Sequence, residues 1–151
     1  MNRAIFGLIL AAMLMAHCGP APVQQVKTDP TAEAWYGPAV ERLTAMDRSA
    51  EQLLQSGRNQ DAAAIVTAGQ SLQSRLLSAP RPTLAAMEAI ADLDHVYGRL
   101  LVSNGYFGEA RLLFQKNVTR WKTWKPQSPE TENRLKQANQ DIADCDRHMG
   151  A

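Results

Sequence analysis

Apolar side chains recur every three or four residues in five successive segments of this chain. This interval places them on one face of an α-helix, and no stretch shows the alternation of apolar and polar residues that is typical of β-strands. The segments end at residues that interrupt helices, namely Gly57, Pro80-Arg81-Pro82, Asn104-Gly105 and Lys125-Pro126. Short connections of this kind favour neighbouring helices that fold back on each other. The sequence therefore predicts an all-α fold of about five helices in antiparallel hairpins.

Several residues are typical of helix ends. The segment Asp29-Pro30-Thr31 favours the start of a first helix, which Gly37-Pro38 is expected to break or kink. Thr83 is suited to cap the third helix, and Ser128-Pro129 is suited to begin the fifth. Cys145 lies on the apolar face of the fifth helix, so we expect a buried free thiol there.

The first residues of the chain have the pattern of an export signal. Arg3 precedes an uninterrupted apolar stretch of thirteen residues, Ala4 to Ala16. As a helix this stretch would be roughly 20 Å long, shorter than the ~30 Å apolar core of a bilayer, which favours a signal peptide over a membrane span. The segment Leu14 to Cys18 resembles the lipobox of bacterial lipoproteins, with His17 where that family has a small residue. The resemblance implies a signal peptide over residues 1–17 and lipidation at Cys18.

The next segment, residues 18–29, is polar and interrupted by proline, and it is expected to form the lipidated end and a flexible tether. Residues 30–151 are then expected to form a single helical domain. Gly19 replaces the aspartate that, in the lipoprotein family, favours retention in the inner membrane. We therefore expect an exported protein that is anchored in the outer membrane and faces the periplasm. A periplasmic or secreted protein without lipid is the alternative.

Two segments of the chain repeat the same arrangement of residues around a glycine. In each, an acidic residue follows the glycine by four positions, alanine by five and a bulky apolar residue by nine. These residues are Gly57, Asp61, Ala62 and Val66 in the first segment, and Gly105, Glu109, Ala110 and Phe114 in the second. Glycine permits a sharp turn between two helices, and alanine permits their close approach. The repetition predicts two similar helix hairpins.

This spacing resembles the tetratricopeptide repeat over roughly residues 41–125. Gly98, seven residues before Gly105, stands where that family has the small residue of its first helix. The chain departs from the family in the distance between its turns, 48 residues against 34, and in Asp94 and Lys122, which replace an aromatic residue and a proline. The resemblance implies a short solenoid in which the first helix of each hairpin lines a groove. A simple helical bundle is the alternative.

Composition and motifs exclude several classes of function. Without the proposed leader the chain has fifteen basic and fifteen acidic residues, so it lacks the charge excess of a protein that binds nucleic acid. The sequence contains no phosphate-binding glycine loop, no His-Glu-x-x-His and no paired Cys-x-x-Cys. We therefore expect no enzyme activity, no cofactor and no metal site, and contact with a membrane only through the lipid anchor.

One face of the third predicted helix carries four charged or titratable residues, Glu88, Asp92, His95 and Arg99. A partner could bind this face, or a carboxylate could assist His95 in proton transfer. The simpler alternative is a solvated face with ion pairs three and four residues apart. If the hairpins stack, two residues of the first helix join this face. The candidate partner-binding residues are then Arg48, Glu51, Glu88, Asp92, His95 and Arg99.

These features predict an envelope-anchored protein–protein interaction module, an accessory of an assembly or secretion complex, with a protein or peptide as its partner. A first alternative is a small periplasmic ligand-binding protein or enzyme that uses the His95 face, with Asp92 within hydrogen-bonding distance of His95. A second alternative is a structural lipoprotein without a defined partner.

Overall fold

The structure, a computed structural model, describes residues 29–150. Every regular element in this range is helical, which confirms the predicted all-α fold. The elements are the 3₁₀ helix η1 (Pro30–Ala32) and the α-helices α1 (Tyr36–Gln55), α2 (Asn59–Leu76), α3 (Leu84–Ser103), α4 (Phe107–Thr123) and α5 (Pro129–Met149). The predictions for the signal peptide, for Cys18 and for the tether up to Thr28 concern residues outside the described range.

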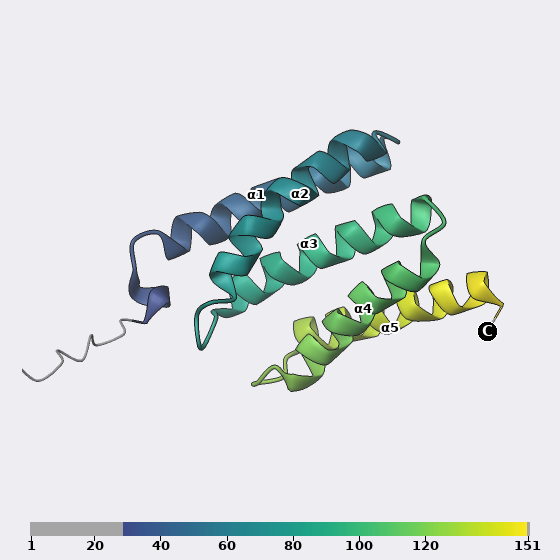
Figure 1. The fold of residues 1–151 in the computed structure, drawn as a ribbon. Coiled ribbons are helices and arrows are strands. Elements are labelled where there is room, and N and C mark those ends of the chain that lie inside the picture. Colours follow the sequence, from purple (N-terminus) through teal and green to yellow (C-terminus); the bar gives the residue numbers. More distant parts are fainter. Residues whose placement is uncertain (1–28, 151) are drawn as a thin grey trace, which may run out of the picture.

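The five α-helices of residues 29–150 pack in chain order. Figure 1 shows the pair α1 and α2 on one side of the molecule, α3 across the middle and the pair α4 and α5 on the other side. Helix α3 packs against α1, α2 and α4, whereas α5 packs against α4. Consecutive helices run antiparallel, so the predicted hairpins are confirmed, and the packing fits a small helical bundle or a short solenoid.

The turns of the hairpins α1/α2 and α3/α4 have the same geometry. Gly57 and Gly105 have φ angles of +75° and +80°, in the left-handed region that favours glycine. In both turns the residue after the glycine donates a backbone hydrogen bond to the carbonyl five residues earlier. These bonds join Arg58 to Leu53 at 2.8 Å and Tyr106 to Leu101 at 2.9 Å. The repeated glycines therefore perform the role that their spacing predicts.

Small residues let the hairpin helices approach closely. Ala62 and Ala110, five residues after the turn glycines, are fully buried. A Cβ atom placed on Gly98 of α3 would lie only 2.5 Å from Cε1 of Phe114 in α4. The ring of Phe114 thus fills the space that a side chain at position 98 would need.

The hydrophobic core has two parts. The larger part lies between α1, α2 and α3, and it includes the fully buried Leu43 and Leu93. The smaller part lies between α4 and α5, where Phe114 meets Cys145. Cys145 is fully buried and free, as predicted, and burial raises the pKa of its thiol, with Asp141 and other nearby carboxylates adding to the effect.

The N-terminal part of the fold differs from the prediction. Asp29 caps η1 by accepting a hydrogen bond from the Thr31 backbone N–H at 3.0 Å, but this helix ends at Ala32. Helix α1 begins at Tyr36, so Gly37-Pro38 lies in its first turn and does not break a longer helix. Proline is tolerated there because the first N–H groups of a helix have no intrahelical partner.

The predicted caps of α3 and α5 are confirmed. The Ala86 N–H donates to Oγ1 of Thr83 at 3.2 Å. Ser128 and Thr131 form a reciprocal capping box, in which the Thr131 N–H donates to the Ser128 side chain at 3.2 Å and the Ser128 N–H donates to the Thr131 side chain at 2.8 Å. These local bonds set where both helices begin.

Candidate functional site

A groove with many charged residues in its lining runs along α3, between α1 on one side and α5 on the other. It consists of three adjoining hollows of about 260, 80 and 400 Å³. Asp92 and His95 line the first and second hollows, Arg99 lines the first and third, and Asp141 lines the second and third. We call this joined surface the α3 groove. Its charged or titratable residues are Asp47, Arg48 and Glu51 from α1, Asp92, His95 and Arg99 from α3, and Arg134, Asp141 and Asp144 from α5.

The structure brings together most of the residues predicted to bind a partner. Arg48, Glu51, Asp92, His95 and Arg99 all line the hollow of about 260 Å³ between α1 and α3. The Glu51 carboxylate and the Arg99 guanidinium form an ion pair that joins these two helices, although they are 48 residues apart in the chain. Helix α1 therefore packs beside α3, which is the arrangement on which the prediction of the six candidate residues depends.

Glu88, the sixth predicted residue, belongs to a cluster around Arg134 of α5. Arg134 Nη1 donates to Asp92 Oδ1 at 2.6 Å, and Arg134 Nε lies 2.9 Å from Glu130 and 3.9 Å from Glu88. The guanidinium also lies over the ring of Trp121, 5.5 Å from its centroid. Burial alone would lower the pKa of Arg134, but Asp92 and Glu88 outweigh it and raise that pKa above its ordinary value. Arg134 therefore remains charged and connects α5 to α3.

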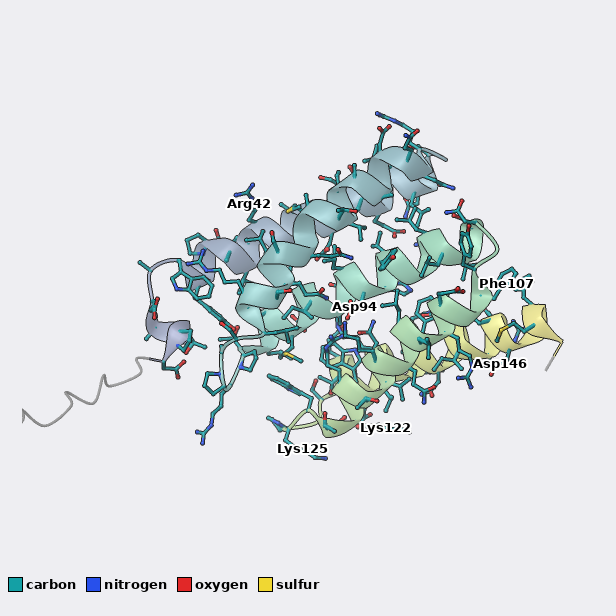
Figure 2. The ribbon with its side chains drawn as sticks, in the orientation of Figure 1. Arg42, Asp94, Phe107, Lys122, Lys125 and Asp146 are labelled. Carbon is teal, nitrogen blue, oxygen red and sulfur yellow. The ribbon has the colours of Figure 1, made fainter. Side chains whose placement is uncertain are left out.

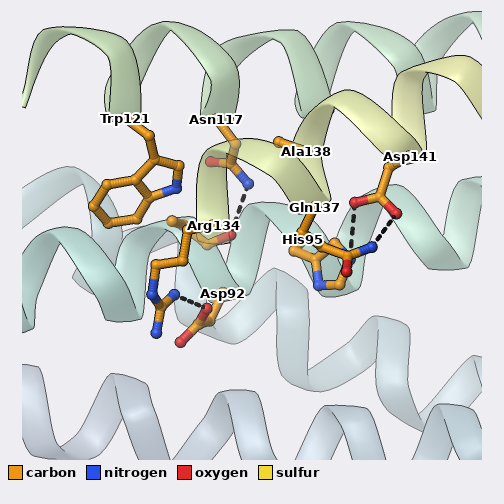
Figure 3. A pocket seen from close by; sticks show the side chains of 9 residues that line it. Asp92, His95, Asn117, Trp121, Arg134, Gln137, Ala138 and Asp141 are labelled. Carbon is orange, nitrogen blue, oxygen red and sulfur yellow. Dashed lines mark hydrogen bonds and ion pairs between the residues drawn. The ribbon is translucent and has the colours of Figure 1, made fainter. Parts of the chain in front are cut away.

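The carboxylate partner of His95 is Asp141 of α5. His95 Nε2 lies 3.2 Å from Asp141 Oδ2, and the histidine side chain is 32% exposed (Figure 3). Gln137 donates to the other oxygen of Asp141 at 3.0 Å. The alternative reading expected Asp92 within hydrogen-bonding distance of His95, whereas the described ion pairs join His95 to Asp141 and Asp92 to Arg134. Asp141 lies 46 residues away from His95, so local helical spacing could not identify it.

The hollow around the His95–Asp141 pair is lined mainly by charged and amide side chains, with one aromatic ring. Its lining includes Asn117, Trp121, Arg134 and Gln137, but no serine, threonine, cysteine, tyrosine or lysine. Within residues 29–150, no group of three or more His, Cys, Asp or Glu side chains is arranged to hold a metal ion. The arrangement is suited to binding polar or charged groups through hydrogen bonds and ion pairs.

Asp47 of α1 is the most unusual residue of the groove. Its exposed fraction is 5%, and neither carboxylate oxygen has a hydrogen-bond partner in the described part of the chain. Burial raises the pKa of Asp47 to about 8, with Asp92 and Asp94 adding to the shift. An unpaired buried carboxylate is unfavourable because it loses its hydration without gaining a partner.

Asp94 is also a buried carboxylate, but unlike Asp47 it is bonded to several donors. Asp94 lies near the centre of the molecule, whereas Arg42, Lys122 and Lys125 lie at its edges (Figure 2). The Asp94 carboxylate accepts hydrogen bonds from Arg120 Nη2 at 2.9 Å and from Gln73 Nε2 at 2.8 Å. Lys116 Nζ lies 3.1 Å from Asp94 Oδ2. This network joins α2, α3 and α4, and it is part of the core. Asp47, by contrast, is part of the lining of the hollow between α1 and α3, with both carboxylate oxygens buried.

Sequence reasoning missed Asp47, Arg134, Asp141 and Asp144, but it contained a signal for Asp47. The two turn glycines are 48 residues apart, and the same interval relates Asp47 to His95. Since His95 was placed on the groove face, the repeat places Asp47 there as well. No comparable signal exists for the α5 residues, because α5 lies outside the two repeated segments.

Comparisons of this chain with family models, with curated proteins and with solved structures found no match. None of the helices in residues 29–150 is both long enough and apolar enough to cross a membrane.

Proposed function

We propose that the protein is an envelope-anchored interaction module that binds a protein or peptide partner in the α3 groove. The main support is a groove that is lined by residues of α1 to α5 and contains a buried carboxylate, Asp47, with no hydrogen-bond partner among the described residues. Extended or helical segments of other proteins bind in grooves through apolar anchors that are surrounded by a polar rim. The resemblance of the two hairpins to tetratricopeptide repeats supports the same use. We propose an accessory role in an assembly or secretion complex.

The anchor in this proposal is the lipidated Cys18, exposed after removal of residues 1–17, with residues 18–29 as a tether. Each buried methylene of an acyl chain contributes about 0.8 kcal/mol, so several chains hold a protein stably at a bilayer. We propose that the helical domain is held at the outer membrane, on the periplasmic side. Lipobox resemblance and the short apolar leader support this placement.

Site-specific photocrosslinking in intact cells tests the proposed groove. A photoreactive amino acid replaces Arg48 or Gln137, which lie at the groove on α1 and α5, or Gln70 of α2, which is exposed and lies outside the lining of the groove. The expected result is an adduct of the same mass from positions 48 and 137 and none from position 70. Equal adducts from all three positions, or none from the groove positions, would contradict the proposal.

Mass spectrometry of the mature N-terminus tests the proposed anchor. The expected species begins at Cys18 and carries the mass of a diacylglyceryl group and an N-linked acyl chain. The Cys18→Ser variant is expected to leave the membrane fraction, while the unsubstituted chain stays in it. A mature protein that begins elsewhere without lipid would show that the anchor is wrong and leave the groove to be judged by crosslinking.

A further inference from the structure

We propose that Asp47 is the receptor for a positively charged side chain, lysine or arginine, of the segment that binds in the α3 groove. This inference depends on the proposed function, because it assumes that a partner segment enters the groove. It adds a chemical requirement that the proposed function alone does not contain. One position of the partner must carry a cation that reaches Asp47.

The first argument is the state of the carboxylate. Asp47 is 5% exposed, and both of its oxygens are buried without a hydrogen-bond donor in the described residues. Buried carboxylates are ordinarily bonded to donors, as Asp94 is to Arg120 and Gln73. Asp47 therefore has the capacity to accept several hydrogen bonds that the described residues do not supply.

The second argument is access. Asp47 lines a hollow of about 260 Å³, much larger than the roughly 30 Å³ that one water molecule occupies in the liquid. Val96 contributes an apolar wall to this hollow. An aliphatic stem that ends in a charged group matches such a site, because the stem can contact the wall while its end reaches the carboxylate.

The third argument is that the nearby cationic side chains pair with other carboxylates or point away from Asp47. Arg99 pairs with Glu51, and Arg134 pairs with Asp92. Arg48 follows Asp47 directly in α1 and is exposed, and adjacent residues of a helix do not face each other. Lys116 and Arg120 bind Asp94. No described cation is thus paired with Asp47.

The fourth argument is the sign of the local field. Asp92 and Asp94 lie close enough to Asp47 to oppose its ionisation, but each is paired with a cation, so a cation that enters here is attracted mainly by the Asp47 carboxylate. A neutral donor would gain hydrogen bonds but not this attraction. A metal ion is disfavoured because the described residues hold no group of three suitable ligands. An ammonium or guanidinium group satisfies both the field and the hydrogen-bonding capacity.

The inference carries a pH dependence with a defined sign. Because the pKa of Asp47 is raised to about 8, the free protein holds a proton there at neutral pH, and a bound cation favours loss of that proton. Affinity is therefore expected to rise with pH, by up to about tenfold per unit between pH 6 and 8. The other charged or titratable groups that line this hollow are Arg48 and Glu51 of α1 and Asp92, His95 and Arg99 of α3, and Asp94 lies nearby. The Asp47→Asn variant isolates the part of the pH dependence that belongs to Asp47.

The test uses the purified full chain and a display library of random peptides at pH 8. Peptides selected by the unsubstituted protein are expected to share lysine or arginine at one aligned position. Their affinity for Asp47→Asn is expected to be about tenfold lower or more, as expected for loss of a charge-assisted hydrogen bond. Asp61→Asn is the matched control, because Asp61 is exposed on α2 and its ion pair within residues 29–150 is with Arg58. Calorimetry of one selected peptide should show proton release near pH 7 that the Asp47→Asn variant lacks.

The outcomes separate this inference from the proposed function. Selected peptides without a shared basic position, or with the same affinity for Asp47→Asn, would overturn the inference and leave groove binding intact. If no peptide is selected and photocrosslinking from positions 48 and 137 also gives no adduct, both proposals fail. Retention of the native far-ultraviolet circular dichroism by Asp47→Asn excludes misfolding as the cause of any loss.

Discussion

Asp47 affects the stability of the fold, because its protonation differs between the folded and unfolded chain. In the unfolded chain its pKa is near the ordinary value of 3.8, whereas in the folded protein burial, with Asp92 and Asp94, raises it to about 8. Between these values the folded protein holds a proton that the unfolded chain releases. The stabilising effect of this proton is complete below pH 4 and is lost as pH rises towards 8.

We therefore expect Asp47→Asn to change the pH dependence of stability. The free energy of unfolding of the unsubstituted protein should fall relative to that of Asp47→Asn as pH rises from 5 to 8, by at most ~1.4 kcal/mol per pH unit. Urea denaturation at several pH values measures this difference. The control Asp61→Asn should show no such trend over this range. A difference between the two proteins that stays constant with pH would contradict the raised pKa.

At the scale of the elements, two glycines at the turn between α3 and α4 differ in whether their backbone conformation requires glycine. Gly105 has a φ angle of +80°, whereas Gly108 lies in the first turn of α4 and has open space around its Cα. We expect Gly105→Ala to lower the free energy of unfolding by ~1–2 kcal/mol, because a Cβ atom is strained in the left-handed region. Gly108→Ala is expected to raise it by ~0.5–1 kcal/mol, because alanine favours helix. Thermal or urea denaturation compares the two, and equal effects would show that the turn does not require glycine.

The contact between α3 and α4 gives a second prediction at this scale. In Gly98→Ala the new methyl group would overlap the ring of Phe114, so we expect a loss of ~1–3 kcal/mol. Phe114→Leu should lose stability by itself but recover part of the loss when combined with Gly98→Ala. A double-mutant cycle from urea denaturation measures this coupling. Strictly additive losses would indicate that the helices do not meet at this point.

For the whole molecule, the question is how α5 is held to the rest of the fold. Helix α5 packs on α4, and two of its side chains reach α3, where Arg134 pairs with Asp92 and Asp141 pairs with His95. These pairs also form one wall of the α3 groove. The position of α5 is therefore part of the geometry of the site.

We expect Arg134→Met to loosen α5 by about 2 kcal/mol, because the Asp92 carboxylate loses a charge-assisted hydrogen bond. Hydrogen exchange measured by mass spectrometry should be faster in the variant than in the unsubstituted protein, and this increase should be larger in α5 than in α1 and α2. Lys136→Met is the control, since Lys136 is exposed on the same helix and forms no ion pair in the described structure. Uniform acceleration across all helices would argue against a specific connection between α5 and α3.

Much of the fold was determined by the sequence itself, because the deciding interactions are local. Apolar side chains at helical intervals defined the helices, Gly57 and Gly105 defined two turns through their backbone freedom, and Thr83 and Ser128 defined helix starts through bonds to residues within one turn. The start of α1 was misjudged, since Gly37-Pro38 is compatible with both the first turn of a helix and a break within it.

Tertiary structure alone decided the chemistry of the groove. The sequence could group Arg48, Glu51, Asp92, His95 and Arg99 by helical face, but it could not show which carboxylate would meet which cation. Arg134, which is 42 residues from Asp92 in the chain, donates a hydrogen bond to the Asp92 carboxylate. The carboxylate that pairs with His95 is that of Asp141. Whether a buried charge such as Asp47 finds a partner depends on how separate helices pack, and spacing along one helix carries no information about that.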